Sequence, residues 1–421
     1  MTVAERRTST RRSTPVTGHS PAATPLKLEP RLKRILEQEY PRFSRAEYER
    51  RQKALGAVME KAGVDHLLVI TDHRSGNAPQ WVTGWPGTVE AYTIFKRGEQ
   101  MWMSVEWLNH LSLAKKIARD VDVHWGEHRG LLKLIEELKR RGAKRVGIMG
   151  PLRTASYKQL ERYFKMVQLD AEYARLRMIK SEEELDWLRI GAAMSDAGLA
   201  ALLEGTRPGL TERELGAIVE SAYVRHGGTT MIHYIGVTSM AKPHIHVPPQ
   251  HPSPRRVQKG DVVFCELSAY WWDYPGQVLR TFTVGADATP LYRKLYDTAE
   301  AAFDSVTAVV RHGTKMQQII DAASVIEEHG YTVCDDLMHG FGGGYFQPIL
   351  GSGSRPAGPL PDMTLEENMT VVVQPNVTTR EDAGEMRGKA RAGVQVGEMI
   401  RITRSGFERL HKAKRGLFRV G

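Results

Sequence analysis

The residue types that most often do chemistry are sparse in this sequence, and one kind of site is excluded at the outset. The two cysteines, Cys265 and Cys334, stand far apart, and no CxxC pair occurs. A zinc site built on cysteine pairs is therefore excluded, because such sites need thiolates at short spacing. So few cysteines are typical of a reducing compartment, and we expect a cytoplasmic protein.

Two histidines lie one residue apart in the stretch Lys-Pro-His-Ile-His-Val-Pro, at 242–248. On a strand, His244 and His246 would face opposite sides, because side chains alternate along an extended chain. One of the two could then act as an acid or base in a site, and the other would be structural.

A run of glycines with one aromatic residue occupies 340–344, directly after His339. Its spacing is similar to that of loops that hold dinucleotide phosphates, but no helix is predicted to follow it. A phosphate site of that type needs a helix N-terminus behind the loop. We therefore interpret the glycines as a turn that gives the backbone room.

The elements that would position these residues begin with an α/β region. Ser44 and Glu47 have capping-box spacing and predict a helix that ends at Gly63. Strand-length apolar runs then alternate with helical patterns, which indicates an α/β domain. We expect strands at 66–70, 81–84, 92–95, 101–105 and 145–149, and helices at 111–119 and 131–141.

The second half of the chain contains an internal repeat. Residues 204–228 and 311–330 each combine a helix end, a Gly-Thr turn, an amphipathic helix and a closing His-Gly. Two similar halves predict one pseudo-symmetric α+β domain with helices outside a curved sheet. Its strands are expected at 261–267, 278–284, 369–374 and 393–403, after a linker at 176–180 and helix starts at Ser181 and Thr211.

Several ordered motifs resemble those of the creatinase, prolidase and methionine aminopeptidase family, M24. They lie at 177–184, 260–263, 280–282, 338–342 and 365–369. The resemblance implies an α+β fold in which a creatinase-like α/β domain precedes a pseudo-two-fold "pita-bread" catalytic domain, and it implies a homodimer. We place a disordered basic tail at 1–28, the first domain at 29–176 and the catalytic domain at 177–421.

The resemblance also implies positions for a site. Metallopeptidases of this family bind two metal ions through two Asp, one His and two Glu. These positions fall on Glu266, Gln277, His339, Gln374 and Gly397. Only the histidine is unchanged, and neutral amides are weak metal ligands. We therefore predict that the chain binds no metal and no other cofactor, and that it is not a dinuclear metallopeptidase.

Creatinase is a member of this family that catalyses without metal. The resemblance of this chain is closest in kind to such metal-independent members. We predict His339 and Glu266 as catalytic acid–base groups, with His244 or His246 as the upstream histidine. The aromatic residues among the predicted substrate contacts favour an aromatic or apolar substrate. The predicted substrate-binding residues are Gln277, Gln374, Trp271, Trp272, Tyr274, Tyr345, Phe346 and Arg355.

The predicted function is hydrolysis of a C–N bond in a small aromatic or carboxylated molecule by His/Glu chemistry. One alternative is a cofactor-free lyase that cleaves a C–C or C–heteroatom bond of an aromatic substrate. Another is a catalytically inactive pita-bread binding protein. A cavity near His339 lined by His, Glu and Gln would favour an enzyme, whereas filling of that space by Trp271 and Phe346 would favour the binding protein.

The net charge of +10 is confined to the two ends of the chain. Residues 1–28 carry +4 and residues 401–421 carry +6, so the body between them is neutral. Nucleic-acid binders spread basic residues along a working face, so we predict solvated tails and no nucleic-acid partner. No segment has the roughly 20 apolar residues of a membrane span, so we predict no membrane partner either.

Overall fold

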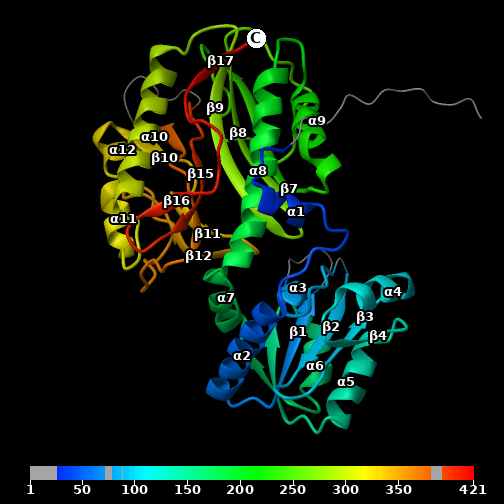
Figure 1. Cartoon of the computed structure of the whole chain (residues 1–421). Coiled ribbons are helices and arrows are strands. Elements are labelled where there is room, and N and C mark those ends of the chain that lie inside the picture. Colours follow the sequence, from blue (N-terminus) through cyan, green and yellow to red (C-terminus); the bar gives the residue numbers. More distant parts are fainter. Residues whose placement is uncertain (1–25, 72–77, 88, 381–390) are drawn as a thin grey trace, which may run out of the picture.

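The structure, a computed structural model, describes residues 26–71, 78–87, 89–380 and 391–421 (Figure 1). A smaller α/β part, drawn in blue to teal, is followed by a larger part, drawn in green to red. The predicted α+β class is confirmed. Of the tail predicted at 1–28, residues 1–25 lie outside the described residues.

The first part is built on a mixed six-stranded sheet of order β4-β3-β2-β1-β5-β6. Every residue of its three central strands β1, β2 and β3 is buried, because helices cover both faces. The strands are β1 (His66–Thr71), β2 (Ala91–Phe95), β3 (Met101–Val105), β4 (Val121–Trp125), β5 (Arg145–Met149) and β6 (Lys165–Gln168). The helices are α2 (Arg45–Ala62), α3 (Ala78–Thr83), α4 (Leu108–Ile117), α5 (Gly130–Arg140), α6 (Thr154–Leu160) and α7 (Asp170–Met178). Helix α1 (Pro30–Leu36) precedes them in the chain but packs on the second part.

Two sequence predictions in this part are corrected by the structure. The strand expected at 81–84 is the end of helix α3, and the edge strands β4 and β6 were not predicted. Trp81 is apolar enough for a strand, but it is buried on a short helix that faces the second part of the chain. Six residues are too few to show a helical period, so tertiary packing decides this segment.

The linker predicted at 176–180 is partly helical. Helix α7 continues to Met178, and α8 (Glu182–Gly205) begins after the predicted capping box of Ser181 and Glu184, which is present in both directions. Lys180 Nζ donates to the carbonyl oxygens of Arg177 (2.6 Å) and Met178 (3.0 Å). The lysine therefore caps the end of α7, as basic side chains often do.

The second part contains a nine-stranded sheet with helices packed outside it, and a separate two-stranded sheet of β10 and β14. The main order of the large sheet is β12-β11-β13-β15-β9-β8-β7, with β16 beside β15 and β17 beside β9. Helix α8 packs on β8 and β9, whereas α10 packs on β13 and β14, as the two predicted halves require. The strands are β7 (Thr229–Ser239), β8 (Asp261–Trp271), β9 (Tyr274–Val284), β10 (Tyr331–Val333), β11 (Met338–Phe341), β12 (Tyr345–Leu350), β13 (Thr370–Val373), β14 (Val377–Thr379), β15 (Gly397–Ile402), β16 (Phe407–Arg409) and β17 (Phe418–Val420). The remaining helices are α9 (Glu212–Tyr223), α10 (Pro290–Val309), α11 (Met316–Ala322) and α12 (Val325–Glu328).

Strands β8 and β9, which include the strands expected at 261–267 and 278–284, pair as a hairpin with a tight turn. Trp272 and Asp273 alone connect the strands, with φ of 49° and 65°. Positive φ at both positions is the geometry of a type I′ turn, whose twist matches the paired strands.

A buried ionic group joins the two parts of the molecule. The Glu184 carboxylate of α8 accepts hydrogen bonds from Trp81 Nε1 (3.1 Å) and Tyr274 Oη (3.0 Å). Arg51 Nη2 of α2 lies 3.3 Å from the same carboxylate, and Arg51 Nε lies 2.6 Å from Glu47. Since Arg51 and Glu184 are each about 1% exposed, their charges depend on one another.

The basic C-terminal end is ion-paired, so the prediction of a solvated tail there is wrong. Strand β17 runs parallel to β9, which fixes the end of the chain on the sheet. Six of the seven basic residues of 401–421 pair with acidic residues. The pairs are Arg401 with Glu182 and Glu408, Arg404 with Glu367, Arg409 with Glu398, Lys412 with Glu29, Arg415 with Glu300 and Asp304, and Arg419 with Asp287.

None of the helices in the described ranges combines the length and the apolar character that a bilayer crossing would need.

Candidate functional site

Four polar side chains that the sequence singled out come from neighbouring strands of the large sheet. Glu266 lies on β8, Gln277 on β9, His339 on β11, and Gln374 directly after β13. All four are nearly inaccessible to solvent, with exposed fractions between 1% and 9%. The structure therefore brings together the polar core of the predicted site.

Three of these side chains, those of Glu266, Gln277 and Gln374, belong to one continuous chain of hydrogen bonds. Gln277 Nε2 donates to Glu266 Oε1 (2.9 Å) and to Gln374 Oε1 (3.2 Å). Gln374 Nε2 donates to Asp336 Oδ1 (2.8 Å), and Tyr345 Oη donates to Asp336 Oδ2 (2.8 Å). We call these five residues the amide network, because two amides connect its two carboxyl groups.

Gly397 makes the centre of the amide network possible. It lies on β15, between the strands that lead to Gln277 and Gln374. A Cβ atom at this position would lie 2.4 Å from the carbonyl oxygen of Val373 and 3.0 Å from Gln374 Cβ. Glu398, the next residue of β15, points to the other side of the strand and so faces away from the network. It is fully buried there and pairs with Arg280 Nη2 at 2.7 Å.

Replacing Gly397 by alanine is expected to lower the free energy of unfolding by about 1–3 kcal/mol, since the added methyl group must displace backbone. Gly406→Ala is the matched control, because a Cβ there meets nothing within 4 Å and should change stability by less than about 0.5 kcal/mol. Urea unfolding of both variants measures the difference. Equal stability of the two variants would contradict this account of Gly397.

His339 sits beside the amide network under an aromatic cover. Its ring stacks on that of Tyr345, with centroids 4.3 Å apart and planes 17° apart, and meets the Phe341 ring edge at 5.4 Å. Burial lowers the pKa of His339 to about 4, although the negative charge of Asp335 opposes the shift. The imidazole is therefore neutral at pH 7.

The two carboxyl groups of the amide network titrate differently from exposed ones. Burial, together with the negative charges of Asp335 and Asp336, raises the pKa of Glu266 to about 8. Burial also raises the pKa of Asp336, while the hydrogen bond from Tyr345 opposes that shift. At pH 7 Glu266 is therefore mainly protonated and can donate a proton.

Asp335 and Asp336 are site residues that the sequence reasoning missed. They lie between β10 and β11 in the chain, and only the pairing of strands in the sheet brings them near Glu266. The available signal was a pair of acidic residues between Cys334 and Leu337: in the structure these two flanking residues and Asp336 are buried, whereas Asp335 is exposed. Adjacent carboxylates within an apolar segment are often functional, because burying charge is costly.

The two predicted upstream histidines lie in a loop after β7 rather than on a strand. His244 is exposed, and its Nδ1 is 2.8 Å from Thr238 Oγ1. His246 is half-buried, and its carbonyl oxygen lies 2.4 Å from where a Cβ on Gly393 would be. The hydrogen bond of His244 gives it a structural partner outside the amide network.

The aromatic residues of the hairpin are packed into the core. Trp271, Trp272 and Tyr274 surround Trp187 of α8, with ring centroids 5.0, 6.5 and 5.3 Å from it. The structure does not bring these three side chains into the amide network. Trp187 also stacks on Phe43 at 4.1 Å, so the cluster joins the hairpin to the start of the chain.

Two further predicted substrate contacts have other partners. Phe346 is buried, with Lys180 Nζ 5.0 Å from its ring centroid. The Arg355 guanidinium donates to the backbone oxygens of Val333 (3.3 Å) and Cys334. Arg355 thus supports the segment that leads into Asp335, and these bonds use donors that a substrate carboxylate would need.

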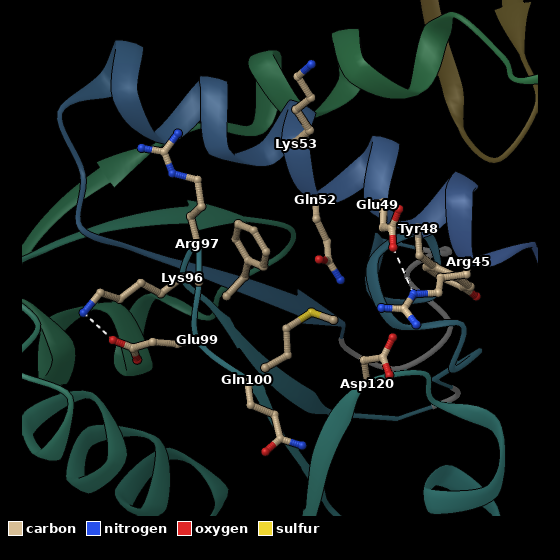
Figure 2. A pocket seen from close by; sticks show the side chains of 13 residues that line it. Arg45, Tyr48, Glu49, Gln52, Lys53, Lys96, Arg97, Glu99, Gln100 and Asp120 are labelled. Carbon is tan, nitrogen blue, oxygen red and sulfur yellow. Dashed lines mark hydrogen bonds and ion pairs between the residues drawn. The ribbon is translucent and has the colours of Figure 1, made fainter.

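A pocket of about 570 Å³ lies elsewhere, between α2 and the turn from β2 to β3 (Figure 2). Arg45 pairs with Glu49 at 2.9 Å, and Lys96 pairs with Glu99 at 2.5 Å. Figure 2 shows Lys53 extending away from the other labelled side chains. Such exposed ion pairs contribute little energy. We place the candidate site at the amide network and not at this pocket.

Comparison with known proteins decides the family. Residues 186–404, more than half of the chain, match the description "Metallopeptidase family M24". The chain belongs to family M24. An uncharacterised hydrolase/peptidase of Sinorhizobium fredii is 25% identical over 404 residues, which cover 89% of this chain and 97% of that protein. The Xaa-Pro dipeptidase of Pyrococcus furiosus is 25% identical over 278 residues, covering 65% of this chain and 75% of the relative.

Solved structures of M24 relatives share the fold. The X-Pro aminopeptidase of Thermotoga maritima superposes with a TM-score of 0.74 at 17% identity and covers 88% of this chain and 99% of its own. The Xaa-Pro dipeptidase of Bacillus anthracis gives 0.74 at 20% identity and covers 89% and 100%. The predicted pita-bread architecture is confirmed.

One prediction is contradicted by these likenesses. The chain was expected to stand apart from the dinuclear metallopeptidases, but its family is a metallopeptidase family and its relatives are Xaa-Pro dipeptidases. That expectation is wrong. The metal-independent qualifier, the aromatic substrate and the lyase alternative find no support in these relatives either.

The family name implies a metal ion, so the side chains at the family's ligand positions must be compared with what a metal ion needs. Gln277 and Gln374 turn their Nε2 groups toward neighbouring oxygens, and Gly397 offers no ligand. Within the described residues no group of three or more His, Cys, Asp or Glu side chains is placed to hold a metal ion. These side chains do not fit a metal centre, so no chemical step below involves one.

Proposed function

We propose that this M24 protein hydrolyses a C–N bond in a small peptide-like substrate at the amide network. The single observation that supports this most strongly is a pair of opposite protonation states. Glu266, with a pKa of about 8, is protonated at pH 7, whereas His339, with a pKa of about 4, is neutral. Groups whose pKa values are pushed apart in one site are suited to acid and base roles.

The proposed step uses one proton acceptor and one proton donor. His339 takes a proton from water as the water oxygen bonds to the substrate carbonyl carbon. Glu266 gives its proton to the leaving nitrogen as the C–N bond breaks. The negative charge of Asp335 favours the imidazolium that forms on His339, since it already raises the pKa of that residue.

The remaining network residues would hold the substrate. Gln277 and Gln374 form the polar wall between the two carboxyl groups, and they are proposed as substrate contacts. The names of the relatives suggest a dipeptide as the substrate. A molecule as short as a dipeptide would suit the amide network, whose polar groups lie below the protein surface. A homodimer and a cytoplasmic location remain predictions.

The pH dependence of hydrolysis tests the assignment. We expect kcat/KM for Xaa-Pro dipeptides to be bell-shaped, because His339 loses its basic form below about pH 4 and Glu266 loses its acidic form above about pH 8. The profile would be recorded with chelated protein and with added Mn²⁺. A profile that keeps rising above pH 9 in both conditions would contradict the role of Glu266.

A further inference from the structure

Tyr345 is an exposed residue that contacts two buried ones. Tyr345 is 54% exposed, although its hydroxyl group donates at 2.8 Å to the carboxyl group of Asp336, a residue that is 8% exposed. The ring also stacks at 4.3 Å on His339, which is 2% exposed. Tyr345 therefore lies between solvent and two buried groups, the Asp336 carboxyl and the His339 imidazole.

The backbone before Tyr345 is unusual as well. Gly342 and Gly343 have φ of 125° and 76°, a region that side-chain-bearing residues rarely adopt. A Cβ on Gly342 would lie 2.8 Å from Thr370 Oγ1 and 3.1 Å from Lys180 Cε. The glycine turn that the sequence showed after His339 thus has a steric reason: it folds β12 back so that Tyr345 reaches His339.

We propose that Tyr345 is a positioning residue of the M24 site: its hydroxyl group orients the Asp336 carboxylate, and its ring shields the His339 imidazole from solvent. The inference rests on the proposed hydrolysis at the amide network. Because Tyr345 is the exposed residue stacked on His339, the proposal makes its outer face the side that a substrate meets. Asp336 in turn holds Gln374 at 2.8 Å, which extends the effect of Tyr345 to the centre of the network.

Two variants separate the ring from the hydroxyl group. Tyr345→Phe keeps the stacked ring and removes the hydrogen bond to Asp336, whereas Tyr345→Ala removes both. Modification of His339 by diethyl pyrocarbonate, followed by peptide mapping, reports the shielding without any substrate. We expect His339 to react about tenfold faster in Tyr345→Ala than in the wild type, and at nearly the wild-type rate in Tyr345→Phe.

A matched control is available on the first part of the chain. Tyr163 is 53% exposed, and Tyr163→Ala should leave the modification rate of His339 unchanged. Circular dichroism would verify that all three variants fold. If His339 in folded Tyr345→Ala reacts as slowly as in the wild type, the shielding role is overturned.

Kinetics test the hydroxyl group. Tyr345→Phe is expected to lower kcat about tenfold with little change in KM, because the substrate-facing ring is retained. Wild-type kcat in Tyr345→Phe would overturn the orienting role. An inactive wild type would overturn the proposed hydrolysis instead, while the modification rates would still decide whether Tyr345 shields His339.

Discussion

Replacing His339 by alanine or Glu266 by glutamine is expected to lower kcat/KM for dipeptide hydrolysis by about 10²–10⁴-fold, the usual contribution of general acid–base catalysis. His339→Ala removes the neutral imidazole that accepts a proton. Glu266→Gln keeps the shape of the side chain and an oxygen that can accept from Gln277, but it cannot release a proton to a leaving nitrogen. Steady-state kinetics near pH 6, between the two pKa values, give the comparison.

The controls for this prediction separate chemistry from folding. His128→Ala alters a histidine that is exposed on the first part of the chain and should retain wild-type activity. The double variant should lose little more than either single variant, because residues that act in one step are not additive. Full activity of either single variant, with or without added Mn²⁺, would refute the role given to that residue.

The second large effect is expected on stability. Arg51→Met should lower the free energy of unfolding by about 3–5 kcal/mol, the cost of breaking a buried ion pair by removing one partner. The substitution leaves Glu47 and Glu184 with too little positive charge in a site that is almost closed to water. Chemical denaturation measures the loss.

A control on the same helix has the same chemistry in an exposed setting. Arg45 pairs with Glu49 at 2.9 Å, and both side chains are more than half exposed. Arg45→Met should therefore change the free energy of unfolding by no more than about 1 kcal/mol. If Arg51→Met proves as mild as Arg45→Met, the ionic group between the two parts does not stabilise their association.

Local patterns predicted much of the fold because their physical causes are local. The helix starts at Ser44, Ser181 and Thr211 are present, since each side chain accepts a hydrogen bond from the third residue of the helix that it begins. The backbone N–H of Ser44 donates to the carboxylate of Glu183 (2.7 Å) on a distant helix and not to Glu47, a contact that local spacing could not reveal. The Glu47 carboxylate accepts hydrogen bonds from Arg50 and Arg51, three and four residues further along the same helix.

The candidate site was predicted unevenly for a similar reason. Motif positions pointed to Glu266, Gln277, His339 and Gln374, and the sheet brings the first, second and fourth of these into one hydrogen-bonded network. Asp336 was missed because its place depends on the pairing of β11 with β12 and β13. The tryptophans of the hairpin were expected near the site, but their rings pack against Trp187 of α8.

The sequence alone determined the family motifs, the α+β class, the order of most elements, and the loss of carboxylates at three of the five family positions. These features depend on residue type and short spacing, which the chain carries without folding. The tertiary structure alone decided which groups share one environment: that Glu266 is buried beside Asp336 and becomes an acid near neutral pH, that Tyr345 covers His339, and that the basic end of the chain is neutralised by distant carboxylates. Desolvation and charge pairing depend on distances between segments far apart in sequence, and only the folded sheet sets those distances.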